Sequence, residues 1–124
     1  MSNAILQFVY AGVIFVIIFI SGFWLTFTGK PYNGIILTVH KLISLAALVF
    51  LGYLLYRVHQ GAGLSTVVII ASVFTAIFFI ALIATGGMLS SGLPPSSLVL
   101  LLHFVLPYLA VVSSGVMLYF LLGR

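Results

Sequence analysis

The chain has 124 residues, of which 65% are hydrophobic and only 3% are charged. A soluble domain carries charge on roughly a quarter of its residues, so this composition excludes a water-soluble globular protein and indicates a protein surrounded by lipid. The chain contains no Asp, Glu or Cys, which excludes carboxylate acid–base catalysis, thiolate-bound metals, iron–sulfur clusters and thioether-attached haem. Its formal charge of +4 comes from scattered cations that form no nucleic-acid-binding patch.

Four apolar segments follow one another along the chain, at about 4–28, 33–57, 64–89 and 95–122. Each is close to the ~20 residues that a helix needs to cross a bilayer, and each is too long and too continuous for a barrel strand. Short connections rich in Gly, Pro and Ser separate them. The sequence therefore predicts an all-α fold: an integral membrane antiparallel four-helix bundle, running up-down-up-down, as a single domain over residues 1–124.

Four crossings place both termini on one side of the membrane. The first segment has no basic residues ahead of its apolar core, which is also longer than that of a typical signal peptide, so we expect a retained helix. Arg57, His59 and Arg124 fall on the side of the termini, and Lys30 and Lys41 fall on the other side. The positive-inside rule then favours cytoplasmic termini.

Two of the three histidines, His40 and His103, lie inside apolar segments. An imidazole in hydrocarbon needs a polar partner or a ligand, because burying it without one is unfavourable. His40 follows Asn33 by seven residues and His103 follows Pro95 by eight, on two helices that run in the same direction. At a rise of ~1.5 Å per residue, the two imidazoles are expected at the same depth to within a few ångström. This match is the main indication of a shared ligand.

Residues three or four positions apart share a helical face. The faces of the two histidines carry small residues and one proline, which are Ser44, Ala47, Pro107 and Ala110. Small side chains beside two imidazoles would leave a slot for a flat ligand between the second and fourth helices, and the proline would kink the fourth helix there. We interpret this pattern as a site for one haem b, with His40 and His103 as the axial ligands of the iron.

Other residues on this side of the membrane would complete such a site. Lys30 and Lys41 are expected to pair with the haem propionates, unless Lys41 extends to the membrane surface instead. The glycines that would admit the porphyrin edge, or else allow close helix packing, are Gly22, Gly86 and Gly87. The hydroxyl groups available to bond a haem or a quinone belong to Ser21, Thr26, Thr85 and Tyr108, and nothing in the spacing chooses among them.

His40 stands in the segment 38–45 (TVHKLISL), and His103 stands in the segment 102–107 (LHFVLP). With four predicted membrane helices, these segments resemble the small membrane-bound b-type cytochromes, the cytochrome b561-like four-helix bundles in which histidines on separate helices clamp haem b. The resemblance implies one-electron transfer with quinone, ascorbate or superoxide. Those families commonly hold two haems with four histidines, whereas this chain offers one pair within its apolar segments.

Other functions stay open at this point. A non-catalytic small membrane subunit would use the histidines only for hydrogen bonds between helices, and it would carry no chromophore. A small transporter is a weaker alternative, because the chain has no acidic residue for proton coupling and no evident inverted repeat. Zinc is also weaker, since two histidines leave its usual ligand set incomplete. The expected partners are the lipid bilayer and either quinone or another redox protein, and homo-oligomerisation is left open.

Overall fold

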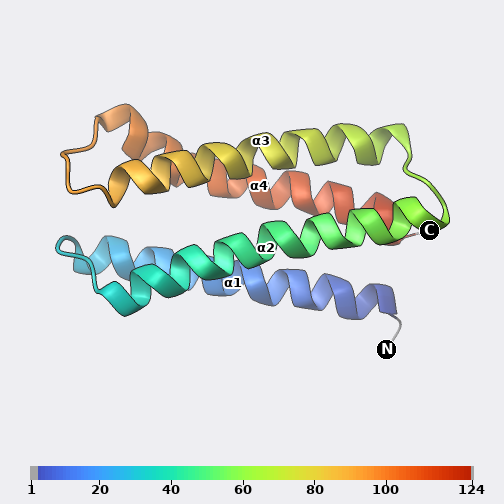
Figure 1. Cartoon of the computed structure of the whole chain (residues 1–124), viewed down its shortest axis with the longest axis horizontal. Helices are drawn as coiled ribbons and strands as arrows, with labels where there is room; N and C mark the ends of the chain where they lie inside the picture. The colour runs from blue at the N-terminus through green and yellow to red at the C-terminus, as the bar shows by residue number, and fades with distance from the viewer. Residues whose placement is uncertain (1–2, 124) are drawn as a thin grey trace. The chain divides into compact units, whose positions relative to one another are not determined.

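The computed structural model describes residues 3–123, and every regular element in that range is an α-helix (Figure 1). The four helices are α1 (Asn3–Thr28), α2 (Gly34–Gly61), α3 (Thr66–Leu89) and α4 (Ser97–Leu122). The shortest, α3, has 24 residues, which at ~1.5 Å per residue is longer than the ~30 Å hydrocarbon core of a bilayer. The predicted all-α fold with four long helices is confirmed. Arg124, used above to predict the orientation, lies outside the described residues.

The helices form two compact units, each an antiparallel helical hairpin. In the first hairpin α1 packs against α2, and in the second hairpin α3 packs against α4 (Figure 1). The first hairpin ends at Gly61 and the second begins at Ala62. Short turns join the two helices of each hairpin, as the Gly- and Pro-containing connections predict.

Both hairpin turns are built in the same way. Gly29 (φ 66°) and Gly92 (φ 84°) adopt the left-handed backbone conformation that favours glycine. The helix that follows each turn begins with a side-chain cap: Asn33 Oδ1 accepts from the backbone N–H groups of residues 35 and 36 at 2.9 and 3.1 Å, and Ser96 Oγ accepts from that of residue 99 at 3.2 Å. These caps fix the first residues of α2 and α4.

One helix end differs from the prediction. We expected the second helix to end near residue 57 and His59 to lie in a loop, but α2 continues to Gly61 and His59 lies in its last turn. A cationic or polar side chain near a helix C-terminus interacts favourably with the exposed carbonyl groups, so polar composition alone does not end the helix there. The chain leaves the helical path at Gly63, which has a φ of 75°.

Large apolar side chains cover the outer surfaces of both hairpins. Phe27 and Ile35 are 85% and 75% exposed in the first hairpin, and Ile80 and Val112 are 64% and 65% exposed in the second. Monomeric soluble proteins rarely expose contiguous apolar patches on this scale. All four helices are long and apolar enough to cross a membrane by length and composition. These properties identify a multi-pass integral membrane protein.

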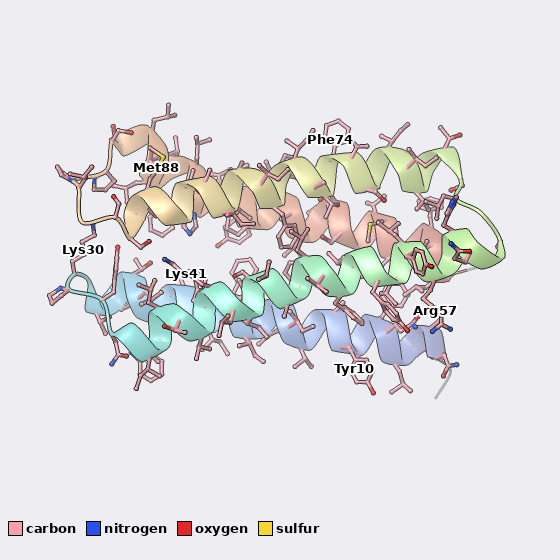
Figure 2. The ribbon with its side chains drawn as sticks, viewed as in Figure 1. Tyr10, Lys30, Lys41, Arg57, Phe74 and Met88 are labelled. Carbon is pink, nitrogen blue, oxygen red and sulfur yellow. The ribbon has the colours of Figure 1, made fainter. Side chains whose placement is uncertain are left out.

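Polar and aromatic side chains lie toward the ends of the first hairpin. Figure 2 shows Lys30 at the turn between α1 and α2, and Tyr10 and Arg57 near the opposite end. The Arg57 guanidinium donates to the Tyr53 hydroxyl at 2.7 Å and lies over its ring. Lys30 Nζ lies 5.7 Å from the centre of the Tyr32 ring. Aromatic rings and long cationic side chains are enriched where a membrane helix meets the headgroup region.

The turn glycines provide a test of this fold. Gly29→Ala and Gly92→Ala should each destabilise the protein by about 1–2 kcal/mol, because a Cβ is unfavourable in the left-handed conformation. Gly12→Ala is the control, since a Cβ at Gly12 would meet no atom within 4 Å and Ala favours a helix. Unfolding by SDS in mixed micelles measures the difference. Equal unfolding midpoints for Gly29→Ala and Gly12→Ala would contradict the described turn.

Candidate functional site

His40 is held in the first hairpin by a hydroxyl from the neighbouring helix. It is the seventh residue of α2 and is partly buried. Its Nδ1 lies 2.8 Å from Ser21 Oγ, which α1 supplies and which belongs to a buried residue. The polar partner that a membrane-embedded imidazole requires is therefore a serine on the adjacent helix.

The hydrogen bonds of Ser21 indicate which ring nitrogen carries the proton. The hydroxyl has one hydrogen, and its oxygen lies 2.8 and 3.0 Å from the carbonyl oxygens of Ile17 and Ile18, which can only accept. When the hydroxyl hydrogen bonds one of these carbonyl oxygens, the ring nitrogen that faces Ser21 must be the donor of their shared hydrogen bond. We therefore assign the proton to Nδ1, which donates to Ser21 Oγ. In a neutral imidazole Nε2 then carries the lone pair that can bind a metal.

A glycine allows the His40 ring to approach α1 this closely. A Cβ built on Gly22 would lie 3.1 Å from His40 Cε1, which is tighter than most real contacts of such an atom. Any larger residue at this position would push against the imidazole. Ser21 and Gly22 therefore act on the same ring, one through a hydrogen bond and the other by leaving space.

The second hairpin repeats this arrangement. Thr85 Oγ1 of α3 lies 2.8 Å from His103 Nδ1 of α4. Its oxygen also lies 2.8 and 3.2 Å from the carbonyl oxygens of Ala81 and Leu82. A Cβ on Gly86 would lie 3.2 Å from His103 Cε1. By the same reasoning, Nδ1 of His103 donates to the buried threonine hydroxyl and Nε2 carries the lone pair.

The repeated geometry reflects a repeat in the sequence. From the turn onward, equivalent residues are 63 positions apart: Gly29 and Gly92, Pro31 and Pro94, Asn33 and Ser96, His40 and His103, Ala47 and Ala110. The preceding helices match at 64 positions, where Ser21-Gly22 corresponds to Thr85-Gly86. The sequence analysis did not identify this repeat. The signal that reveals it is a hydroxyl residue followed by glycine, then Gly-x-Pro-x-Asn/Ser, and histidine seven residues after that cap.

The residue four positions after each histidine differs between the hairpins. Ser44 Oγ donates to the His40 carbonyl oxygen at 2.6 Å, adding a hydrogen bond to the backbone of α2. Pro107 occupies the equivalent position inside α4 and has no N–H to donate to the His103 carbonyl. Ser44 and Pro107, which were both predicted as site residues, thus lie about one helical turn after a histidine. There they affect the hydrogen bonds of the helix backbone rather than those of the imidazole ring.

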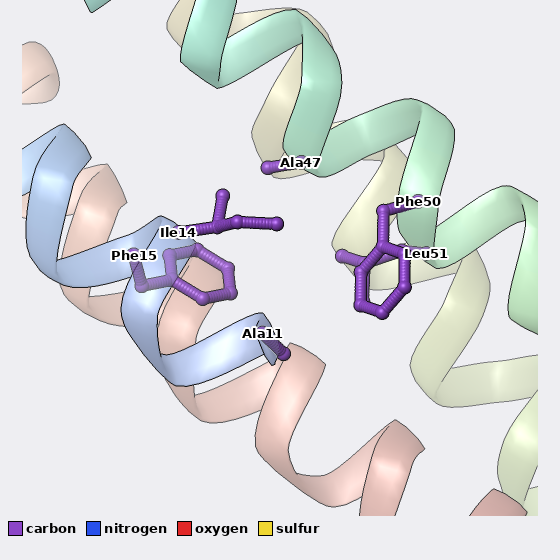
Figure 3. Close-up of a pocket in the computed structure, with 6 residues that line it drawn as sticks. All are labelled: Ala11, Ile14, Phe15, Ala47, Phe50 and Leu51. Carbon is purple, nitrogen blue, oxygen red and sulfur yellow. The ribbon is translucent and has the colours of Figure 1, made fainter. Parts of the chain in front are cut away.

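Ala47 and Ala110 are the equivalent small residues further along α2 and α4, and both are buried, at 2% and 1% exposure. Ala47 borders a small apolar recess between α1 and α2, whose other lining residues are Ala11, Ile14, Phe15, Phe50 and Leu51 (Figure 3). The recess leaves no space for even a water molecule. This recess is not large enough for a porphyrin.

The predicted cationic residues both belong to the first hairpin, and both are exposed. Lys30 lies in the turn, and Lys41 directly follows His40 on α2. Gly87 is also exposed, and a Cβ there would meet no atom within 4 Å. Its neighbour Gly86, rather than Gly87, is the glycine next to the imidazole of the second hairpin.

Comparison of the chain with protein-family models, with curated proteins and with solved structures gave no match. Function is therefore inferred from the residues themselves. Of the hydroxyl residues considered from the sequence, Ser21 and Thr85 contact the histidines, whereas Thr26 Oγ1 donates to the Gly22 carbonyl oxygen at 3.1 Å.

The contacts of Gly22 and Gly86 predict a specific pattern of stability. Gly86→Ala should destabilise the haem-free protein by about 1–3 kcal/mol relative to Gly87→Ala, because the new methyl group overpacks the His103 ring. Gly22→Ala should act similarly on His40. Both alanines gain the same helix propensity, so the comparison isolates the contact with the ring. SDS unfolding measures the difference, and equal stability of Gly86→Ala and Gly87→Ala would contradict the described packing.

Proposed function

We propose that this membrane protein binds one haem b, with Nε2 of His40 and Nε2 of His103 as the two axial ligands, and carries single electrons. The observation that supports this function most strongly is the repeated contact between a buried hydroxyl and Nδ1 of a membrane-embedded histidine. Histidines that bind metals almost always use their other ring N–H to bond an acceptor, which fixes the tautomer and the orientation of the ring. Each hairpin provides one such histidine.

The donor set fits haem iron better than it fits other metals. The chain has no carboxylate or thiolate side chains, so imidazoles are the strong metal ligands available, and those of His40 and His103 lie away from the C-terminal helix end that holds His59. Haem supplies the remaining four iron ligands itself, and its chemistry is reversible one-electron transfer. With imidazoles on both faces there is no open coordination position, which favours electron transfer over oxygen binding.

The other predicted residues have defined roles in this proposal. Lys30 and Lys41 neutralise the propionates, because carboxylates near hydrocarbon require a cation or the membrane surface. Ser44, Pro107 and Gly87 would lie along the path of the porphyrin, whereas Ala47 and Ala110, at 2% and 1% exposure, would contribute through close packing of the helices. The electron partner is a quinone or another redox protein, and no residue of the chain acts as a catalytic acid or base.

A second candidate function is a non-catalytic membrane subunit. The hydrogen bonds of His40 and His103 favour it, since each joins two helices and satisfies one polar atom of the imidazole. Both functions require these bonds, but only the haem function also requires Nε2. The two candidates are therefore separated by whether the protein binds haem.

The haem function predicts a characteristic absorption spectrum. Protein expressed with sufficient haem and purified in detergent should show a Soret band and, after reduction by dithionite, the sharp α and β bands of a low-spin haem b. His40→Ala and His103→Ala should each abolish haem binding or convert it to a high-spin form. His59→Ala is the matched control, because His59 lies in the last turn of α2, toward the opposite end of that helix from His40.

A colourless wild-type protein, despite ample haem, would contradict the haem function and favour the non-catalytic subunit. Full haem binding by His40→Ala or by His103→Ala would show that the mutated residue is not a ligand. In either case, SDS unfolding of the same samples shows whether the protein or its variant has kept the wild-type fold.

The proposed topology has both termini in the cytoplasm and the two hairpin turns on the opposite side. The chain contains no Cys, so single cysteines can report the side of each connection directly. An impermeant maleimide added outside should label Lys30→Cys and Ser91→Cys but not Gln60→Cys. Labelling of Gln60→Cys, but not of Lys30→Cys and Ser91→Cys, would show the opposite orientation. Labelling of only one of Lys30→Cys and Ser91→Cys would contradict the proposed number of membrane crossings.

A further inference from the structure

We infer that Ser21 and Thr85 are positioning residues that set the ligand strength of His40 and His103, an inference that rests on the proposed haem function. Each hydroxyl lies 2.8 Å from Nδ1 of its histidine. The same contact occurs independently in two hairpins that differ in most of their other residues. The feature retained in both is a hydroxyl side chain, as serine in one and threonine in the other.

Each hydroxyl is part of a short hydrogen-bonded relay. In the first hairpin Nδ1–H donates to Ser21 Oγ, and Ser21 donates to a backbone carbonyl of α1. In the second hairpin Thr85 forms the same link between His103 and the Ala81 carbonyl. A hydroxyl that donates to a carbonyl becomes a stronger acceptor, since hydrogen bonds in a chain polarise one another. This increases the electron density at Nε2.

Increased electron density at Nε2 stabilises the ferric state more than the ferrous state. Ser21 and Thr85 therefore lower the reduction potential of the iron. They also hold the imidazole in the tautomer that can bind it, because a proton on Nε2 would block coordination. Both hydroxyl residues are buried, at 7% and 6% exposure, so water does not readily replace them.

Gly22 and Gly86 help the hydroxyl residues to position the imidazole rings. Each directly follows the hydroxyl residue and leaves the space into which Cε1 of the histidine fits, at 3.1 and 3.2 Å from a notional Cβ. The dipeptide Ser/Thr-Gly thus holds the ring from one side, with a hydrogen bond at Nδ1 and close packing at Cε1. Nε2 of each ring also lies near the glycine, at 3.8 Å from the notional Cβ of Gly22 and 3.9 Å from that of Gly86.

The test compares variants that lack each hydroxyl with variants in which serine and threonine are exchanged, so that the hydroxyl is kept. Ser21→Ala and Thr85→Val should each raise the reduction potential and weaken haem binding by about tenfold or more. Ser21→Thr and Thr85→Ser should retain both properties, because they keep the hydroxyl. Thr28→Val is the control on α1, since the Thr28 hydroxyl donates to the Trp24 carbonyl oxygen rather than to Gly22 or a histidine. The conservative variants keep the test valid if an alanine or valine variant does not fold.

A second readout does not depend on haem. The ¹⁵N chemical shifts of the histidine rings in haem-free protein distinguish a proton on Nδ1 from a proton on Nε2. Wild-type His40 and His103 should be protonated at Nδ1; Ser21→Ala should shift His40 toward the other tautomer and leave His103 unchanged, and Thr85→Val should do the reverse.

The two readouts separate the inference from the proposed function. If wild-type protein binds no haem, the proposed function fails, and the ring tautomers still show whether the hydroxyls control the histidines. If wild-type protein binds haem but Ser21→Ala and Thr85→Val retain its potential, affinity and tautomers, the inference is overturned while the proposed function stands. A potential that shifts equally in Thr28→Val would also overturn the inference.

Discussion

The hydrogen bond between a hydroxyl on one helix and Nδ1 of a histidine on the next is the interaction on which the candidate site depends. An imidazole among apolar helices has two polar atoms, and leaving them unsatisfied is costly. Ser21 and Thr85 satisfy one atom in each hairpin, at 2.8 Å. This contact in turn requires a short distance between the helices, which Gly22 and Gly86 permit. The proposed function assigns coordination of the iron to the remaining ring nitrogen, Nε2.

The two hairpins have equivalent residues from the turn glycines, Gly29 and Gly92, to the buried Ala47 and Ala110. The Asn33 and Ser96 caps set the first residue of α2 and of α4, so His40 and His103 are each the seventh residue of their helix. Equal placement within each hairpin explains why both histidines meet a hydroxyl on the preceding helix. A chain that provides two equivalent imidazoles through the same local structure is well suited to a cofactor with two equivalent axial positions.

The two hairpins also differ in some of the residues near the histidines. Ser44 adds a hydrogen bond to the His40 carbonyl, whereas Pro107 removes a backbone donor at the equivalent place in α4. In the second hairpin Thr75 Oγ1 lies 3.0 Å from Ser113 Oγ, a polar contact between α3 and α4. The recess of the first hairpin, lined by Ala11 and Leu51 among others, is apolar at the corresponding level. The repeat therefore preserves the contacts of the histidines more closely than the packing around them.

The sequence predicts the helices well because membrane helices are dictated by the length and apolar character of a segment. It also identifies His40 and His103 as candidate site residues, because an ionisable residue within an apolar segment is recognisable from the sequence alone. The contacts of these residues are harder to predict, because one step along a helix turns the side chain by about 100°. This rotation is why the sequence, which offers Gly86 and Gly87 alike, does not show that Gly86 is the one beside the ring. Choosing Ser21 and Thr85 over Thr26 required the packing of two helices, or recognition of the repeat.

The haem content of the purified protein tests the central proposal most directly. Titration of haem into haem-free protein, with haem measured as its pyridine complex and protein by amino-acid analysis, gives the number bound per chain. If each hairpin contributes one axial ligand to a shared iron, the titration should end at one low-spin haem per chain. An end point of two haems per chain, or no saturable binding, would contradict that proposal.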